Sequence, residues 1–380
     1  MPNRDQTRFG LCSELNLAGK ETMARKLTHT LDGQVVAFEH ISSILRDNPL
    51  GDPNHRTHHV YLPPQYDSSP RGRSFPVLYD LVGYTGSGGS HTGWRSFDEN
   101  VPERLDRLIA DKKMPPCIVV FPDCFTALGG NQYINSSAIG RYADFLTKEL
   151  ISAVDKEFRT KPDRAHRGVF GKSSGGYGAL IHGMKYAEHW GAIASHSGDC
   201  YFEFIYKAEW LITLTALQAY ASGNQPPKAR QSKPGHDDGR IKRFLERIWQ
   251  TERPSGSDIT VLMMICMAAT YDPDPKAPLG FRLPYDLNTG EFLERRWQRW
   301  LKHDPVHLAP ESRQNLKRLK AIFIDCGWRD QYHIHFGSRQ LSSILKRMNI
   351  KHTYEEFNDT HSGIDYRMDR SLPFLARAIR

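Results

Sequence analysis

The stretch Gly168-Val169-Phe170-Gly171-Lys172-Ser173-Ser174-Gly175-Gly176 decides the fold that the sequence predicts. A short apolar run leads into it, and a segment typical of a helix follows it. The spacing Gly171-x-Ser173-x-Gly175 is that of a nucleophile elbow, a sharp turn between a strand and a helix. Such a turn strains the backbone of its central residue and needs glycines where backbones pack closely. The Ser173 hydroxyl is therefore predicted to be exposed beside the positive end of a helix.

The same residues also offer an alternative interpretation. Gly171-Lys172-Ser173 resembles the end of a phosphate-binding loop, GxxxxGK[ST]. The first glycine of that loop would have to stand at position 166, where the chain has His166. Because this leaves the cradle of backbone amides incomplete, we favour the elbow over a phosphate site.

Around the elbow, apolar runs of strand length alternate with segments of helical periodicity. Strands are predicted at 34–38, 57–62, 75–82, 117–121, 167–170, 192–195, 321–325 and 352–357. Helices are predicted at 100–112, at 137–158, after Ser173, and at 337–347. Several strands are continuously apolar, as strands buried on both faces of a parallel sheet are. The alternation predicts an α/β fold with a mostly parallel, doubly wound sheet.

The length of 380 residues allows two or three domains, but the strand–helix rhythm is broken only in one long stretch. Residues 206–300 combine helical pieces with a Gly/Pro/Lys-rich loop at 222–239. We interpret them as a largely helical cap inserted into one catalytic domain, formed by 34–205 and 301–380. Residues 1–33 are polar and weakly periodic, and are predicted to be a loosely attached leader.

An elbow serine needs a base and an acid that orients the base. On this kind of sheet the acid follows a late strand and the histidine lies in a loop further on. Asp330 follows the strand predicted at 321–325, and His361 follows the strand predicted at 352–357. Asp325 is the second candidate for the acid, and Asp359 is the third.

The oxyanion of an acyl-transfer reaction needs two backbone donors. The N–H of Ser174, the residue after the nucleophile, is the first. The glycine-rich loop 81–90 follows an earlier strand, and the N–H of Tyr84 is our choice for the second.

These stretches carry a resemblance to a known family. The chain resembles the putative esterase family of α/β-hydrolases, which includes esterase D, enterochelin esterases, feruloyl esterases and mycolyltransferases. The matching stretches are 77–83, 171–176, 195–199, 325–330 and 360–361. The resemblance implies an α/β-hydrolase fold with Ser173 as nucleophile, Asp330 as acid, His361 as base, and Tyr84 and Ser174 as oxyanion amides.

The resemblance also implies an activity. It is that of a serine carboxylic-ester hydrolase acting on small or medium esters through an acyl-enzyme, without a cofactor. An acyltransferase with the same triad, and an inactive binding protein on the same scaffold, are the alternatives. Val82 stands where the family usually has His or Asp, and Gly363 where an aromatic residue is frequent. The substrate of a named member therefore does not transfer to this chain.

Four further polar residues follow strand ends, where open α/β sheets bind ligands. Asp123, Asn131, Tyr133 and Asp199 are candidates for lining the substrate pocket, with a structural role in loops as the equal alternative. His333 and His335 form an HxH pair that could hold a metal with Asp330 or His361. Because a metal there would compete for the acid of the triad, we predict no metal.

Composition narrows the class of protein. The net charge of +8 comes from basic residues interspersed with acidic ones, so we expect no nucleic-acid partner. No apolar run approaches the 18 residues of a membrane span. Six cysteines without a CxxC pair, and no visible signal peptide, lead us to expect free thiols in a cytoplasmic protein. A small-molecule ester is the expected partner, and a homo-oligomer is left open.

Overall fold

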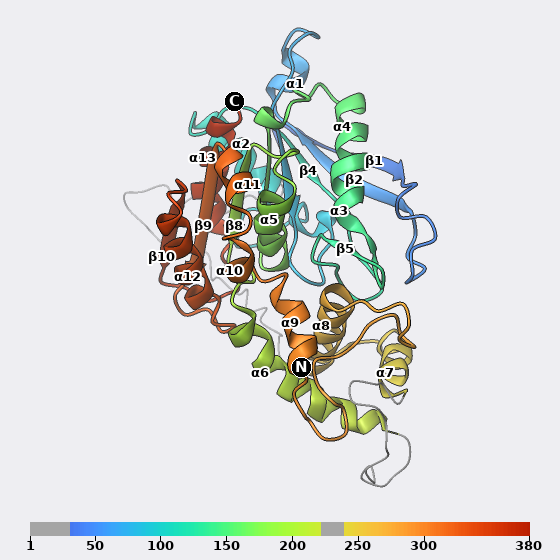
Figure 1. Ribbon diagram of the computed structural model, residues 1–380. Helices are drawn as coiled ribbons and strands as arrows, with labels where there is room; N and C mark the ends of the chain where they lie inside the picture. The colour runs from blue at the N-terminus through green and yellow to red at the C-terminus, as the bar shows by residue number, and fades with distance from the viewer. Residues whose placement is uncertain (1–30, 222–238) are drawn as a thin grey trace, which may run out of the picture.

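The computed structural model describes residues 31–221 and 239–380 of the chain (Figure 1). Residues 1–30 of the predicted leader lie outside the described residues. Residues 222–238 of the loop predicted at 222–239 also lie outside them. The last residues of the predicted leader are hydrogen-bonded to the fold. The N–H groups of Asp32 and Gly33 donate to the Asp106 carboxylate at 2.7 and 3.1 Å.

The core of the fold is an eight-stranded sheet in the order β1-β2-β4-β3-β7-β8-β9-β10. Its strands are β1 (Gln34–Ile41), β2 (His55–Leu62), β3 (Val77–Leu81), β4 (Ile118–Phe121), β7 (Arg167–Lys172), β8 (Ala192–His196), β9 (Ala321–Gly327) and β10 (Thr353–Phe357). β2 runs antiparallel to both of its neighbours, and the other pairs in this sheet are parallel. The predicted mostly parallel sheet is confirmed, with each predicted strand within a few residues of its observed bounds.

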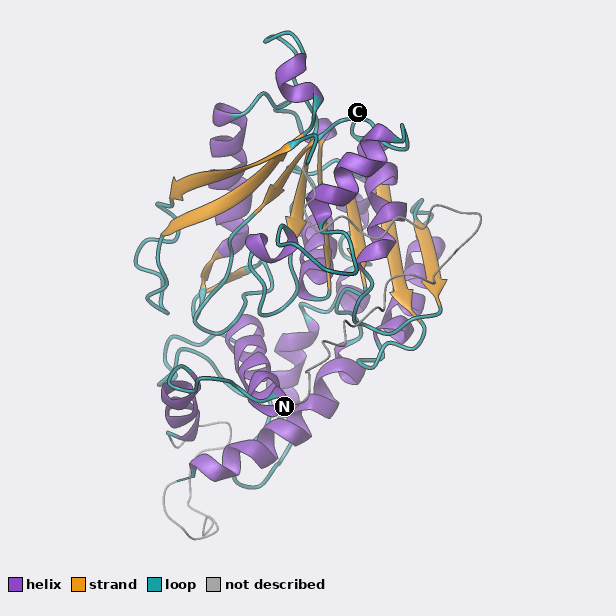
Figure 2. Ribbon diagram, turned by 180° about the vertical axis from the view of Figure 1, so that it is seen from behind, coloured by secondary structure: helices purple, strands orange, loops and turns teal. Residues whose placement is uncertain are grey.

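Helices cover both faces of this sheet (Figures 1 and 2). Along a strand, successive side chains point to opposite faces, so Val169 packs in one apolar cluster and Phe170 in the other. The cluster around Phe170 is covered by α2 (Val101–Ala110) and α13 (Met368–Ala378). The cluster around Val169 is covered by α4 (Ile151–Glu157), α5 (Ser174–Lys185) and α12 (Ile334–Arg347).

Short helices connect these layers. They are α1 (Gln65–Ser68), η1 (Gly88–His91), η3 (Arg164–His166), α10 (Pro305–Leu308), α11 (Arg313–Arg318) and η5 (Asp365–Arg367). At the start of α2, the Asn100 side chain accepts the Glu103 N–H, and the Glu103 carboxylate accepts the Asn100 N–H. This reciprocal capping box fixes where the helix predicted at 100–112 begins.

The helix predicted at 137–158 is wrong in its first part. A small hairpin of β5 (Asn135–Ser136) and β6 (Gly140–Arg141) occupies its beginning. Gly140 has φ +149°, which no right-handed helix accommodates. Helical structure follows as α3 (Tyr142–Asp144), the π-helix η2 (Phe145–Leu150) and α4, and their apolar stripe is buried as expected.

Among the described residues, the predicted insertion contains the short 3-10 helix η4 (Gln218–Tyr220) and four α-helices that lie past the end of the sheet toward which its parallel strands point (Figure 2). The four α-helices are α6 (Phe202–Leu217), α7 (Arg240–Ile248), α8 (Gly256–Tyr271) and α9 (Glu294–Leu301). The rings of Trp210, Tyr271 and Trp300 are buried among them, and Tyr271 also packs edge-on against Tyr177 of α5 at 5.9 Å. These three rings therefore belong to a core that is continuous with that of the sheet.

Candidate active site

Ser173 stands at the junction of β7 and α5 with φ 56° and ψ −124°. A β-carbon at Gly171 or at Gly175 would overlap the carbonyl oxygen of Leu81 on the neighbouring strand β3. Only glycine permits this packing of strand, turn and helix. The elbow that the sequence predicts is thus present in its geometry, with a strained serine held between two glycines.

We predict that Gly175→Ala lowers the free energy of unfolding by about 3 kcal/mol, because the new methyl group must displace strand β3. Gly72→Ala is the matched control, since a β-carbon at Gly72 meets no atom within 4 Å. Chemical denaturation followed by circular dichroism measures both. Equal unfolding midpoints for the two variants would contradict the packing argument.

His361 and Asp330 meet although they come from different loops. Asp330 follows β9, His361 follows β10, and His361 Nδ1 lies 2.7 Å from Asp330 Oδ2. Asp330 is 2% exposed, and its other oxygen accepts the N–H of Tyr332 at 2.9 Å. The backbone N–H of His361 donates to Gln331 Oε1 at 3.0 Å. The imidazole is therefore fixed in orientation, and its Nε2 has no hydrogen-bond partner among the described residues.

The two other candidates for the acid have different partners. Asp325 is fully buried, lies 2.6 Å from Nδ1 of His196, and accepts Nε of Arg367 at 2.9 Å. These contacts tie β8 and β9 to the segment that enters α13. Asp359 accepts the phenol of Tyr366 at 3.1 Å. Of the three carboxylates, Asp330 is the one that contacts His361.

The predicted oxyanion loop runs directly beside the serine. A β-carbon at Gly83 would lie 3.5 Å from Cβ of Ser173. Within residues 31–221 and 239–380, the N–H groups of Tyr84 and Ser174 have no acceptor. The loop is held by side chains, since the hydroxyl of Tyr84 donates to Leu128 O at 2.7 Å and that of Tyr133 donates to Val82 O at 2.6 Å.

Ser173, His361, Tyr84 and Ser174 line one cavity of about 670 Å³. Its apolar lining includes Ile205 of α6, Ile259 and Met263 of α8, and Ile334 of α12. Its charged lining includes Arg95, Lys172 and Asp365. Lys172 adjoins Ser173 in the sequence and could have been inferred from that, whereas nothing in the sequence pointed to Arg95 or Asp365.

The four candidates for the substrate pocket lie in different places. Asp199 lines the cavity of Ser173, but Asp123 lines a second cavity. Asn131 stabilises its own loop. Its side-chain N–H donates to Cys124 O at 2.5 Å, and its side-chain oxygen accepts the N–H of Tyr133 at 2.7 Å. Tyr133 supports the oxyanion loop from outside the cavity. The structure thus brings only Asp199 of these four to the serine.

The pKa values of three ionisable groups that line the cavity are shifted by their surroundings. Burial alone would lower the pKa of His91, but the Asp80 carboxylate 2.7 Å from its Nδ1 raises that pKa above its usual value, with a smaller contribution from Asp365. Burial raises the pKa of Asp199, against the hydrogen bond from Tyr206. For Asp365, burial would raise the pKa, but the hydrogen bond from Arg95 and the nearby charges of Lys172, His91 and Arg95 together outweigh it, so the pKa is lowered.

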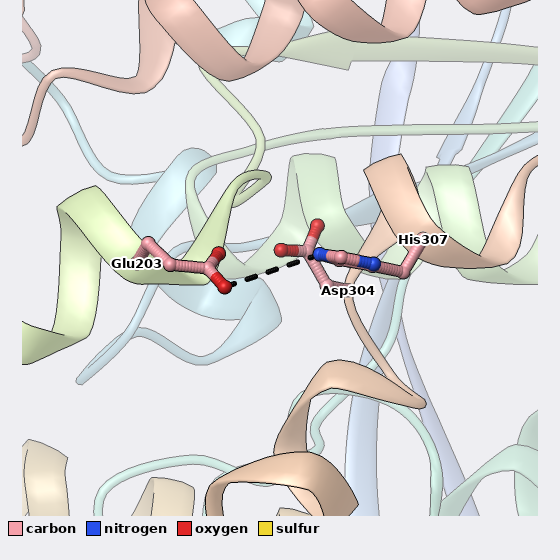
Figure 3. A group of neighbouring side chains, drawn as sticks. All are labelled: Glu203, Asp304 and His307. Atoms are coloured by element: carbon pink, nitrogen blue, oxygen red, sulfur yellow. Dashed lines mark ion pairs between the residues drawn. The ribbon is translucent and has the colours of Figure 1, made fainter.

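A group of potential metal ligands lies outside this cavity, where the sequence did not point. Glu203, Asp304 and His307 have ligand atoms within 4.8 Å of one another (Figure 3). The Asp304 carboxylate already accepts three backbone N–H groups, those of Tyr201, Phe202 and Val306, at 2.7–3.0 Å. These contacts cap α10 and the start of α6, which explains the buried acid without a metal. His333 and His335 belong to no such group among the described residues.

No helix among the described residues is long and apolar enough to cross a membrane. The five cysteines in the described part of the chain are buried and free of disulfides, as expected, and Cys12 lies outside it. Burial raises the pKa of Cys117 and of Cys266 to about 12, so neither thiol ionises readily.

Solved structures share the fold of this chain. A ferulic acid esterase aligns with a TM-score of 0.55 and 18% identity, over 92% of this chain and 100% of its own. An S-formylglutathione hydrolase from Agrobacterium tumefaciens aligns with a TM-score of 0.52 and 16% identity, over 93% and 98%. At these identities the likeness establishes the α/β-hydrolase fold.

Sequence comparison identifies the family. An esterase of Mycobacterium tuberculosis is 37% identical over 145 residues, which are 37% of this chain and 28% of that protein. An endo-1,4-beta-xylanase/feruloyl esterase of Xylanibacter ruminicola is 32% identical over 153 residues, 38% of this chain and 20% of that protein. The family model described as putative esterase matches residues 53–369. With the elbow, the His361–Asp330 pair and this match over most of its length, the chain belongs to the putative esterase family.

Proposed function

We propose that the protein is a serine carboxylic-ester hydrolase that works through a Ser173–His361–Asp330 triad and an acyl-enzyme. The observation that carries this proposal is the 2.7 Å contact between His361 Nδ1 and Asp330 Oδ2, because His361 lines the same cavity as the strained Ser173. Membership of the putative esterase family supports it.

The first half of the reaction forms the acyl-enzyme. Ser173 Oγ attacks the ester carbonyl carbon while His361 Nε2 accepts the hydroxyl proton. Asp330, which accepts from Nδ1, holds the reactive tautomer and stabilises the imidazolium. The carbonyl oxygen becomes an anion that receives hydrogen bonds from the free N–H groups of Tyr84 and Ser174. The tetrahedral intermediate collapses, and His361 returns its proton to the departing alcohol.

The second half of the reaction hydrolyses the acyl-enzyme by the same steps, with water as the nucleophile. His361 removes a proton from the water, which attacks the acyl carbon, and the proton passes to Ser173 Oγ as the acid leaves. No step calls on a metal or a cofactor. The acyl group faces the apolar wall that α6 and α8 supply, where an aliphatic or aromatic group gains by leaving water.

Asp199 is proposed as a substrate contact at the edge of this apolar wall. One of its oxygens accepts the hydroxyl of Tyr206 at 2.7 Å and the amide of Gln132 at 3.2 Å. Both donors lie on one oxygen, Oδ2, so the other remains available to a donor on the substrate.

Labelling with a fluorophosphonate tests the proposed nucleophile. The reagent is expected to modify Ser173 alone, because it needs a serine activated by a base. Mass spectrometry of the digested protein locates the adduct. Ser174→Ala is a matched control, since Ser174 contributes only its backbone N–H, and this variant should still be labelled at Ser173. An adduct on another serine, or none at all, would refute the assignment.

A further inference from the structure

Lys172 is part of the elbow, but the proposed mechanism gives its side chain no role. It stands directly before Ser173, in the stretch of sequence that resembles the end of a phosphate-binding loop. Its side chain is 21% exposed and lines the cavity of Ser173. Among the described residues its ammonium group has no hydrogen-bond acceptor, and its ion-pair partner, Asp365 Oδ1, is 3.9 Å away. The N–H donors of Lys172 are therefore free to bind a ligand beside the nucleophile.

His91 brings a second basic group to the lining of the same cavity. Its Nδ1 lies 2.7 Å from Oδ2 of Asp80, a fully buried carboxylate that has no other hydrogen-bond partner among the described residues. Burial alone would favour the neutral imidazole, but a carboxylate with this single partner favours the imidazolium. In the imidazolium Nε2 is a donor, and no described residue accepts from it.

Asp365 marks the place where the basic groups meet. It accepts a hydrogen bond from Nη1 of Arg95, and the charges of Lys172 and His91 act on it as well. One carboxylate thus already lies among three basic side chains that line the cavity. Because like charges repel one another strongly where little water screens them, a further carboxylate bound here would relieve the repulsion between the basic groups.

The nearby acidic groups do not remove this excess of positive charge. Asp98 lies 3.5 Å from Nη1 of Arg95, but its side chain is 39% exposed and does not line the cavity, so water screens it. Asp199, the other carboxylate in the lining, accepts from the hydroxyl of Tyr206 on α6. The cluster of basic groups around Asp365 is thus left with donors and charge for a ligand.

We propose that Lys172 and His91 bind a carboxylate on the alcohol half of the ester. The inference rests on the proposed function, because the ester bond must lie at Ser173. In that function the acyl group faces the apolar residues of α6 and α8, which leaves the basic part of the lining to the alcohol. Each of the two oxygens of a carboxylate accepts hydrogen bonds, so one can accept from the ammonium group and the other from the imidazolium.

Two acetyl esters that differ by one charge test the proposal. The alcohol of 4-acetoxybenzoate carries a carboxylate, and that of 4-acetoxybenzamide carries a neutral amide of nearly the same shape. For the wild-type enzyme we expect kcat/KM to be about tenfold higher with the benzoate, mainly through KM, which corresponds to about 1.4 kcal/mol. In Lys172→Met, which keeps the length of the side chain without its charge, this ratio should fall to about twofold.

Two further variants make the test specific. Lys172→Arg keeps the charge and should retain most of the preference for the benzoate. Lys185→Met is the matched control, because Lys185 is another partly buried lysine, at the last position of α5, and does not line the cavity. This control should show the wild-type ratio. Equal kcat/KM values for the two esters in the wild type would overturn the proposal, and so would a full preference in Lys172→Met.

The pH profile of the same ratio tests the part of His91. Both esters react through one triad, so the titration of His361 cancels in the ratio. Burial lowers the pKa of His91, as does the charge of Arg95. The carboxylates of Asp80 and Asp365 outweigh both, and the pKa lies above its usual value. The preference for the benzoate should therefore be largest below this raised pKa and fall as the pH rises through it, whereas a ratio independent of pH would contradict the assignment of His91.

Failure of the proposed function gives a different result. If Ser173→Ala hydrolyses both esters at the wild-type rate, the nucleophile is wrong, whatever the ratio of the two rates. If Ser173→Ala hydrolyses neither ester and the wild-type enzyme hydrolyses both without preference, the nucleophile stands and the carboxylate site is wrong.

Discussion

Ser173→Ala is expected to lower kcat for ester hydrolysis by roughly 10⁴- to 10⁶-fold, the range found when a triad nucleophile is removed. The loss is this large because no acyl-enzyme forms without the Ser173 oxygen, and water must then attack the ester directly. The Ser173 side chain also contributes little to the stability of the fold, because the strained backbone at φ 56° is fixed by the glycines around it. The variant should therefore fold as the wild type does.

The measurement is the rate of hydrolysis of 4-nitrophenyl acetate, with the unfolding midpoint recorded for the same preparation. Ser174→Ala should retain activity within about tenfold, since its backbone N–H is unchanged. Near wild-type kcat in Ser173→Ala would exclude the mechanism. A fall in the unfolding midpoint of several degrees would show instead that Ser173 has a structural role.

Asp330→Asn is expected to lower kcat by about 10⁴-fold while the protein stays folded. An amide at this position can donate to Nδ1 of His361, which would move the ring proton to Nε2, the nitrogen that must accept from Ser173. Asparagine matches aspartate in shape, so the packing around Asp330 is retained. The defect is thus one of tautomer and charge, and it should appear in kcat more than in KM.

Asp325→Asn separates catalysis from structure. Asp325 is as buried as Asp330 and also contacts a histidine, but its partners His196 and Arg367 hold β8, β9 and the segment before α13 together. Its substitution should lower the free energy of unfolding by about 3 kcal/mol and leave kcat of the folded fraction nearly unchanged. If Asp325→Asn loses activity and Asp330→Asn does not, the acid has been assigned to the wrong residue.

The sequence predicted the parts of the site that depend on short-range pattern. The elbow could be predicted because the geometry of one turn fixes the spacing of its glycines and serine. Asp330 and His361 were readable because each follows an apolar strand, and parallel strands bring their ends to the same edge of the sheet. Their contact at 2.7 Å follows from β9 and β10 being neighbours.

What the sequence did not predict depends on contacts between distant segments. Arg95 reaches the cavity because it pairs with Asp365, which no local pattern relates to it. Asp123 follows a strand end as the rule requires, yet β4 is separated from β7 by β3 and delivers it to the second cavity. The hairpin β5–β6 was missed because the predicted helix was extended back to Ser137, although its apolar stripe begins only at Tyr142 and Gly140 has a conformation that a helix does not allow.

The pairing of β8 with β9 determines when the proposed active site can assemble during synthesis of the chain. β8 ends at His196 and β9 begins at Ala321, so the sheet gains its later strands only after residues 197–320 have been made. Such pairing between remote segments is slow to form. Ser173 thus emerges from the ribosome long before His361, and under the proposed mechanism a nascent chain that already has the elbow lacks its proton acceptor. Unfinished chains are therefore expected to be inactive toward esters until His361 has joined the fold.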